Sequence, residues 1–402
     1  MSALDRFLRY ISYHTTSDPD SDSCPSTARQ LVLARQLKAE LEEIGAQNVR
    51  SDEKGYTYAV IDASEDCEKL PCIGLIAHID TSSAISGENV KPRMIDNYDG
   101  GDITLCEGVV MTVSDFPSLS DYKGESLIVT DGTTLLGADD KAGVAEIMDA
   151  CERIINENIP HGKIVVAFTP DEEVGRGTES FDLDNFGAEL AYTVDGGKLG
   201  ELEYECFNAV AAAVKINGFS IHPGDAKNKM INAARIACEF VSLMPEAETP
   251  EHTEGYEGFF HLCGMSGSEE SAVLDYIIRD FDIAIVERRK KFMLAAAEML
   301  NVKYGEGTVE VTLSDSYRNM KEKIEPHMEI VERAKAAFAE NGIEAVTTPI
   351  RGGTDGAQLS YKGLPCPNLS TGGHNFHGKY EYIPVHALGK MSDVIISLVK
   401  AR

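Results

Sequence analysis

Basic side chains are scarce in this sequence: 37 Lys and Arg residues stand against 66 Asp and Glu residues, which leaves a net charge of −29. A surface of this sign repels phosphate groups, so we expect neither a nucleic acid nor an anionic membrane as a partner. An apolar run of membrane-spanning length and an N-terminal h-region are also missing. These absences predict a cytoplasmic protein.

Paired cysteines are missing as well. The nine cysteines form an odd set without a C-x-x-C pair, and several, such as Cys151 and Cys238, lie in apolar segments. This pattern predicts reduced thiols in the core of a cytosolic protein. There are no repeats, low-complexity segments or nucleotide-binding glycine loops. What remains is a chain of 402 residues with 43% hydrophobic content, enough for two domains or for one large domain with an insertion.

Short apolar runs alternate with amphipathic helical patterns in the first half of the chain. The strand-like runs lie at residues 56–61, 72–79, 126–130, 163–169 and 190–195. Such alternation predicts an α/β domain with a mostly parallel sheet flanked by helices. Residues 82–125 are irregular, rich in Gly, Asp and Ser, and too long for a simple connection, which indicates a functional loop.

The pattern changes near residue 208. Strand-like runs then lie at residues 210–216, 259–263, 276–281 and 308–313, with helical patterns at 228–243 and 283–300. Two helices on a small sheet predict a compact α+β module of a lid or dimerisation type, inserted into the main sheet. We therefore predict a discontinuous catalytic domain, residues 1–207 and 318–402, and an inserted domain, residues 208–317.

The run at 163–169 is followed by Pro170 and then by three acids in a row, Asp171, Glu172 and Glu173. Parallel α/β sheets place functional groups just past the carboxyl ends of their strands. Adjacent carboxylates repel each other unless cations or protons neutralise them. An acid triplet alone is more often a solvated loop, so the ends of the other strands decide between the two interpretations.

Those ends carry further metal-binding side chains. His78 and Asp80 stand two residues apart at a strand end, so their side chains point to the same face. Asp139 begins a helix, Asp195 ends a strand, and His377 lies in a Gly-rich turn. Each one alone is more often a cap or a surface residue. Together with the acid triplet they supply oxygen and imidazole donors at five separate ends, which predicts a site for zinc or a similar ion.

Seven stretches, spread from the first fifth of the chain to the last, resemble the two-zinc exopeptidase and aminoacylase family, and within it the branch of tripeptide aminopeptidases. They are Ala77–Thr81 (AHIDT), Leu136–Gly143 (LGADDKAG), Ala167–Gly175 (AFTPDEEVG), Thr193–Gly197 (TVDGG), Thr253–Phe259 (TEGYEGF), Ile350–Ser360 (IRGGTDGAQLS) and Gly363–Leu369 (GLPCPNL). The H-x-D and D-E-E pieces are typical of the wider family. TEGYEGF and IRGGTDGAQLS are typical of the branch.

The resemblance implies a role for each matching residue. One zinc ion would be held by His78, Asp139 and Asp195, and a second by Asp139, Glu173 and His377, so that Asp139 bridges both. Asp80 would orient His78, Glu172 would be the general base, and the peptide bond after Asp139 would be cis. The chemistry is consistent, because two metals lower the pKa of a shared water and a metal-free glutamate can move its proton.

The resemblance also implies four substrate-binding residues. His222, Asn232 and Arg279 of the inserted module, with Arg351 of the main domain, match positions that the family uses for the substrate carboxylate or the oxyanion. An arginine suits a peptide C-terminus because its planar fork binds a carboxylate with two hydrogen bonds. Two simpler alternatives stay open: His222 as a loop histidine and Arg279 as an ion-pair partner at an edge strand.

The sequence thus predicts a two-zinc aminopeptidase that removes the N-terminal residue of tripeptides, with small peptides as its partners and with an inserted domain compatible with a homodimer. One alternative is a relative that uses the same metals on dipeptides or acylated amino acids. Another is a catalytically silent relative that serves as a binding or scaffold domain. Retention of every ligand and of Glu172 argues against the silent relative.

Overall fold

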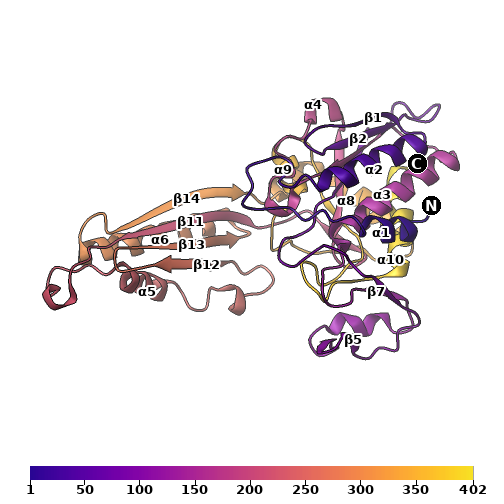
Figure 1. Ribbon diagram of the computed structural model, residues 1–402. Coiled ribbons are helices and arrows are strands. Elements are labelled where there is room, and N and C mark those ends of the chain that lie inside the picture. Colours follow the sequence, from indigo (N-terminus) through magenta and orange to yellow (C-terminus); the bar gives the residue numbers. More distant parts are fainter. Residues whose placement is uncertain (402) are drawn as a thin grey trace. The chain divides into compact units, whose positions relative to one another are not determined.

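The computed structural model describes residues 1–401, which form two compact units (Figure 1). The larger unit comprises Met1–Tyr204, Glu322–Thr348 and the chain from Thr354 onward. The smaller unit comprises Glu205–Lys321 and the short segment Pro349–Gly353. The predicted insertion, residues 208–317, lies within the smaller unit.

An eight-stranded mixed sheet runs through the larger unit in the order β1-β2-β8-β3-β9-β16-β10-β15. Its strands are β1 (Gln47–Ser51), β2 (Thr57–Ile61), β3 (Ile73–His78), β8 (Ile164–Thr169), β9 (Leu190–Gly196), β10 (Glu201–Glu203), β15 (Val346–Thr347) and β16 (Asn368–Ser370). The four central strands, β8, β3, β9 and β16, are parallel. Strands β2 and β10 join them antiparallel on either side, and the outer strands pair antiparallel in β1–β2 and parallel in β10–β15. Every residue of β3 and β8 is buried, as expected for continuous apolar strands covered on both faces. The predicted α/β fold is confirmed.

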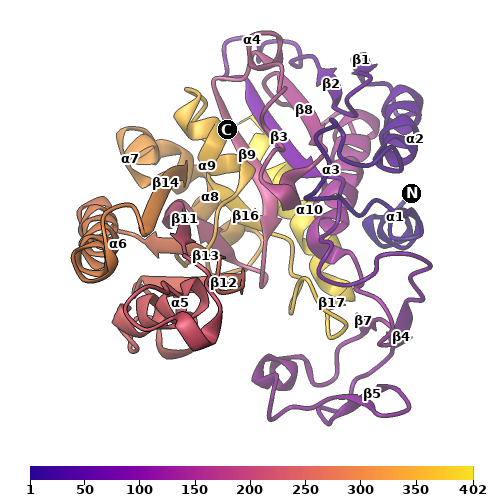
Figure 2. The same cartoon turned by 60° about the vertical axis from the view of Figure 1, so that its left-hand side comes forward.

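Helices accompany this sheet, and several of them pack on it. They are α1 (Ala3–Tyr10), α2 (Gln30–Glu43), α3 (Ala138–Asn156), α4 (Leu183–Phe186), α7 (Lys321–Ile324), α8 (Met328–Glu340), α9 (Asp355–Tyr361) and α10 (Val385–Val399). Helix α3 packs on β3 and β9, with α1 and α10 beside it (Figure 2). A Cβ atom at Gly143 of α3 would lie 1.9 Å from the Val194 carbonyl oxygen, so only glycine permits this close approach of helix and strand.

The stretch 82–125 is more ordered than predicted. It contains β4 (Arg93–Ile95), the β5–β6 hairpin (Ile103–Cys106 and Val109–Met111) and the 3-10 helix η1 (Pro117–Tyr122). Strand β4 joins β7 (Leu127–Val129) and β17 (Tyr382–Pro384) in a three-stranded antiparallel sheet. Strands of three or four residues are too short to show a clear hydrophobic period, which is why the sequence did not reveal them.

The smaller unit is built on a four-stranded antiparallel sheet in the order β12-β13-β11-β14. Its elements are β11 (Asn208–Asn217), α5 (Ala233–Leu243), β12 (Phe259–Gly267), β13 (Ser271–Asp280), α6 (Ile283–Tyr304) and β14 (Val309–Tyr317). Buried and exposed residues alternate along β11 and β13, and the buried ones form a common core with α5 and α6. This is the predicted α+β module, although α5 begins five residues later and β13 five residues earlier than the sequence pattern indicated.

All nine cysteines are free, as predicted. Cys238 corrects one detail, because it lies on the exposed side of α5 and not in the core. Among the helices of residues 1–401, none combines the length and the apolar character that crossing a membrane requires.

Candidate metal centre

Five of the predicted site residues meet in the larger unit. His78 is the last residue of β3, Asp195 lies near the end of β9, and Glu173 follows β8. Asp139 lies at the start of α3, and His377 lies on the loop between β16 and β17. Among the described residues, two groups could hold a metal ion, each with its ligand atoms within 4.8 Å of one another. We call His78, Asp139 and Asp195 the first cluster, and Asp139, Glu173 and His377 the second cluster.

Asp139 belongs to both clusters and directs one oxygen to each. Its Oδ1 lies 2.9 Å from Nε2 of His78, and its Oδ2 lies 3.0 Å from Nε2 of His377. Nε2 of His78 also lies 3.3 Å from Oδ1 of Asp195, and Nε2 of His377 lies 3.0 Å from Oε2 of Glu173. A carboxylate placed in this way has the geometry of a bridging ligand. The peptide bond between Asp139 and Asp140 is cis.

Without a cation, the carboxylates of the two clusters lie close together in a buried place where their negative charges are poorly neutralised. Burial raises the pKa of Glu173 to about 7 and the pKa of Asp195 to about 6. Burial also opposes ionisation of Asp139, but hydrogen bonds from His377 and His78 outweigh it and lower the pKa of that carboxyl. Hydrogen bonds to Asp139 and Glu173 raise the pKa of His377 to about 11. The protonated imidazole thus supplies the positive charge that a metal ion would supply in its place.

A divalent cation fits this donor set. The Oε1 atom of Glu173 is buried and has no hydrogen-bond partner, which is costly for a carboxylate unless an ion contacts it. Imidazole nitrogens and carboxylate oxygens are the ligands that zinc and similar ions prefer. Each cluster therefore has the composition and the spacing of a metal site.

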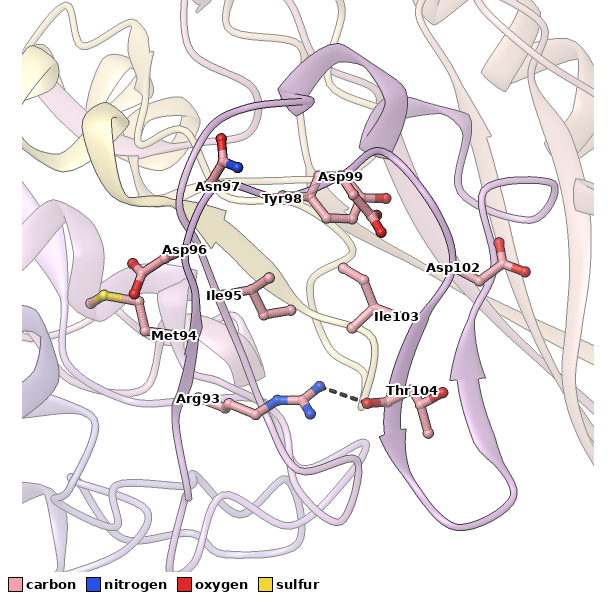
Figure 3. A pocket seen from close by; sticks show the side chains of 10 residues that line it. All are labelled: Arg93, Met94, Ile95, Asp96, Asn97, Tyr98, Asp99, Asp102, Ile103 and Thr104. Atoms are coloured by element: carbon pink, nitrogen blue, oxygen red, sulfur yellow. Dashed lines mark hydrogen bonds between the residues drawn. The ribbon is translucent and has the colours of Figure 1, made fainter.

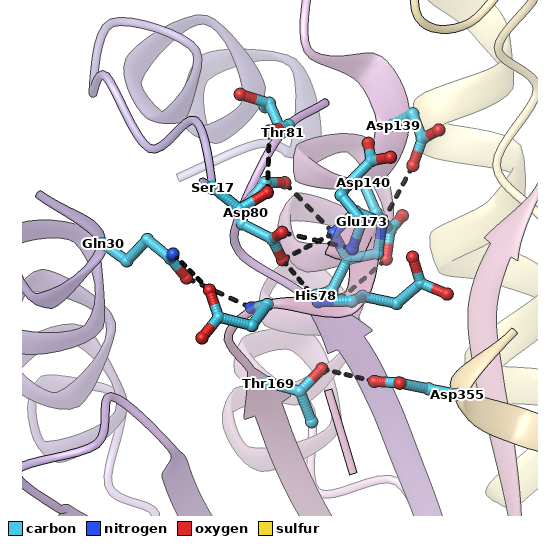
Figure 4. Close-up of polar contacts among 12 residues, drawn as sticks. Ser17, Gln30, His78, Asp80, Thr81, Asp139, Asp140, Thr169, Glu173 and Asp355 are labelled. Atoms are coloured by element: carbon cyan, nitrogen blue, oxygen red, sulfur yellow. Dashed lines mark hydrogen bonds and ion pairs between the residues drawn. The ribbon is translucent and has the colours of Figure 1, made fainter. Parts of the chain in front are cut away.

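Asp80 connects the first cluster with the acid triplet (Figure 4). Its carboxylate is buried and accepts hydrogen bonds from the backbone N–H groups of Glu172, at 3.0 Å, and Glu173, at 3.2 Å. Its Oδ1 also lies 3.4 Å from Nδ1 of His78, and its backbone carbonyl lies 3.1 Å from the same nitrogen. Asp80 is thus placed to orient both an imidazole ligand and the turn that carries Glu172 and Glu173.

The three acids of the triplet have different surroundings. Asp171 has a left-handed backbone, with φ of 58°, and its buried carboxylate accepts hydrogen bonds from Ser26 N–H and Gln30 Nε2, both at 2.7 Å. Glu173 belongs to the second cluster, whereas Glu172 belongs to neither. Burial and the charge of Asp195 raise the pKa of Glu172 well above its usual value. The triplet therefore contains one anchor, Asp171, one ligand candidate, Glu173, and one buried carboxylate outside both clusters, Glu172.

Sequence reasoning missed Glu381. Its buried carboxylate accepts hydrogen bonds from four consecutive backbone N–H groups, those of residues 136–139. The one signal in the sequence was its position four residues after His377, which by itself does not distinguish it from a surface glutamate.

The four predicted substrate-binding residues all lie in the smaller unit. His222 is exposed, and its Nδ1 accepts a hydrogen bond from Gly224 N–H at 3.1 Å. Asn232 caps α5 by accepting a hydrogen bond from Arg235 N–H, also at 3.1 Å. Neither of these contacts tests the predicted substrate role of His222 or Asn232, and that role stays a prediction.

Arg351 corrects the predicted division of the chain, since it belongs to the smaller unit. Its Nη1 donates to the carbonyls of Gly255, at 2.7 Å, and Glu257, at 2.9 Å, and its Nη2 donates to Thr253 Oγ1 at 3.0 Å. Nη1 of Arg279 in turn donates to the Arg351 carbonyl at 3.0 Å. Arg351 thus holds the TEGYEGF loop, a structural task that the sequence did not reveal, and its predicted contact with substrate stays a prediction.

A hollow of about 420 Å³ lies elsewhere in the larger unit, lined by residues between Arg93 and Thr104 (Figure 3). Nη2 of Arg93 donates to the Thr104 carbonyl across it, at 2.6 Å. Its acidic side chains, Asp96, Asp99 and Asp102, do not converge on a common point (Figure 3). The hollow contains none of the predicted site residues and is separate from the two clusters.

The fold is that of a known class of hydrolase. Residues 126–401 match the family described as peptidase family M20/M25/M40. The chain therefore belongs to this family of peptidases, and the resemblance based on the motifs is confirmed. It is 54% identical over 400 residues to Peptidase T from Caldanaerobacter subterraneus subsp. tengcongensis, covering 99% of this chain and 98% of the relative. Peptidase T from Clostridium novyi is 52% identical over 402 residues, with the same coverage.

Solved structures share the fold. An aminopeptidase PepT from Bacillus cereus superposes with a TM-score of 0.77 at 23% identity, covering 99% of this chain and 97% of that one. A Bacillus subtilis protein described as a dinuclear metal-binding peptidase of the M20 family superposes with a TM-score of 0.65 at 15% identity, covering 98% and 96%.

Proposed function

We propose that this peptidase is a two-metal tripeptide aminopeptidase that removes the N-terminal residue of its substrate. The observation that carries the proposal is the arrangement of Asp139, which presents one oxygen to each cluster, next to Glu172, which belongs to neither. The Peptidase T relatives, which match almost the whole chain, support the substrate class.

Zinc is the ion that we propose for both clusters. The first ion would be held by His78, Asp139 and Asp195, and the second by Asp139, Glu173 and His377. When bound, the ions supply Lewis acidity, which polarises the peptide carbonyl and makes a water molecule more acidic.

The side chains of this chain would manage the proton. Glu172 takes one proton from the attacking water and delivers it to the nitrogen of the breaking peptide bond, so that the first residue leaves as a carboxylic acid and the remainder as an amine. Asp80 keeps the base in place, because it binds the N–H groups of both Glu172 and Glu173. Base and metal ligand thus stay in a fixed relation on one short turn.

We also propose the four residues of the smaller unit for substrate recognition. Arg279 and Arg351 are the candidates for binding the C-terminal carboxylate of the peptide, because a guanidinium matches its geometry. His222 and Asn232 are the candidates for the oxyanion. A cytoplasmic location and a homodimer complete the proposal, and measurement of the native mass tests the homodimer.

A peptide panel tests the activity. Di-, tri- and tetraalanine would be compared with acetylated and C-terminally amidated trialanine, while the metal content of the same sample is measured. We expect free trialanine to be the best substrate. Acetylation removes the cationic amine and adds bulk in its place, so we expect kcat/KM to fall roughly a thousandfold, with a smaller loss on amidation. Efficient release of the acyl group or of the last residue from the acetylated peptide would instead indicate an acylase or a carboxypeptidase.

A further inference from the structure

Glu381 lies outside both clusters, yet its carboxylate is held by the backbone that carries Asp139. Oε2 accepts hydrogen bonds from the N–H groups of Leu136, at 2.7 Å, and Gly137, at 2.9 Å. Oε1 accepts hydrogen bonds from those of Ala138, at 2.7 Å, and Asp139, at 3.2 Å. The residue is 1% exposed, so no solvent competes for these donors.

Four consecutive N–H groups that point at one place form an anion-binding concavity. The chain achieves this because Gly137 has a left-handed backbone, with φ of 83°, just before α3 begins. Without an acceptor, these buried donors would lose their hydrogen bonds to water and gain nothing in return. The carboxylate therefore determines the path of the backbone from which the Asp139 side chain projects.

Glu381 also lies at the base of the loop that carries His377. The ends of this loop are joined by hydrogen bonds between His374 N–H and the Tyr382 carbonyl, at 2.9 Å, and between Tyr382 N–H and the His374 carbonyl, at 3.1 Å. Glu381 is the residue next to this junction. One side chain thus connects the base of the His377 loop with the turn before Asp139.

We propose that Glu381 is a positioning residue. It holds Asp139 and His377 in the relative position that the second cluster requires. This inference rests on the proposed metal centre. It predicts that Glu381 affects metal affinity although it contacts neither ligand side chain. A residue that holds the backbone of a ligand determines where the ligand atoms lie.

The test is the variant Glu381→Gln, which keeps the size of the side chain but turns an amide group toward N–H donors. Zinc affinity would be measured by titration against a chromophoric chelator, and the visible spectrum of the cobalt-loaded protein would be recorded. We expect one of the two ions to bind about 10 to 100 times more weakly. We also expect a changed cobalt spectrum and a kcat that falls more than KM rises.

Glu40→Gln is the matched control. Glu40 is also a buried glutamate of the larger unit, and it accepts hydrogen bonds from Tyr10 OH, at 2.7 Å, and from Gln36 Nε2, at 2.9 Å. This variant should lose a similar amount of stability and keep wild-type metal affinity. A role for Glu381 in stability alone would give the same result for both variants.

Wild-type affinity for both ions and an unchanged spectrum in Glu381→Gln would overturn the proposal. Should that variant not fold, Glu381→Asp takes its place, since it keeps the charge but reaches fewer donors. Full metal affinity in this second variant, or failure of both to fold, would show that Glu381 serves folding and not metal positioning. If the wild type binds two ions but cleaves no tripeptide, the proposed activity fails while the result on Glu381 stands.

Discussion

The two clusters share Asp139 but are built very differently. His78 of the first cluster ends a central strand, and its side chain is 2% exposed, whereas the side chain of His377 in the second cluster is 50% exposed. The backbone N–H of His78 donates to Asp140 Oδ2 at 3.1 Å, and its Nδ1 faces Asp80. His377 lies on a loop in a left-handed conformation, with φ of 62°.

The first ligand set is held by the buried sheet, whereas the second set includes a half-exposed loop residue, His377. A side chain that packing already holds loses little freedom when it binds an ion, whereas a half-exposed loop residue has to be ordered first. We therefore expect the first cluster to bind its ion more tightly. The shared carboxylate of Asp139 should couple the two sites.

The largest effect is expected from Asp139→Ala, because it breaks both clusters at once. We expect the variant to lose or loosen both ions and its activity to fall to background, as measured by metal analysis after dialysis and by trialanine cleavage. Asp99→Ala, which removes an exposed acid, is the control and should behave as the wild type. Tight binding of two ions by Asp139→Ala would show that Asp139 does not bridge them.

Glu172→Gln should leave both clusters intact and still stop turnover. Because Glu172 is proposed as the base and not as a ligand, we expect two ions per chain and a kcat about 10² to 10⁴ times lower. Glu173→Gln is the matched comparison, since it should lose an ion from the second cluster. A zinc ion missing from Glu172→Gln would instead place Glu172 among the ligands.

His78→Ala and His377→Ala compare the clusters directly. In the metal-free proteins, removal of the buried imidazole leaves buried carboxylates without a partner, and we expect a loss of about 1–3 kcal/mol in the free energy of unfolding. Removal of the half-exposed imidazole also takes a partner from Asp139 and Glu173, but water can reach that position, so we expect a smaller loss of about 1 kcal/mol or less. Urea unfolding measures both values. Equal losses would mean that the two clusters do not differ in preorganisation.

The smallest effect is expected when the metal ions are removed stepwise from the wild-type protein. Stepwise addition of a chelator should remove the ion of the second cluster first, because its loop ligand opens most easily. Cobalt introduced after partial chelation should then give the spectrum of the refilled second cluster, which His377→Ala cannot produce. Simultaneous loss of both ions would mean that the coupling through Asp139 outweighs the difference in exposure.

Much of the fold could be predicted because it follows from local patterns. The continuous apolar runs of β3 and β8 indicated strands buried on both faces, and the acids after β8 indicated the functional edge. That edge is where the structure brings His78, Asp195 and Glu173 together. The short strands β4, β5 and β6 could not be predicted, since their order comes from neighbours in the fold and not from their own sequence.

The residues that bring charge and imidazole to the ends of the strands can be read from the chain, because a side chain and its place in a hydrophobic pattern are local properties. Which of their atoms meet depends on the folded structure. The two oxygens of Asp139 are shared between His78 and His377, which lie 61 residues before it and 238 residues after it in the chain. Glu381 reaches the turn before Asp139 across more than 240 residues, and Arg351 joins a loop almost 100 residues away. Hydrogen bonds of this kind depend on the position and direction of groups in space, and no local pattern in the chain encodes them.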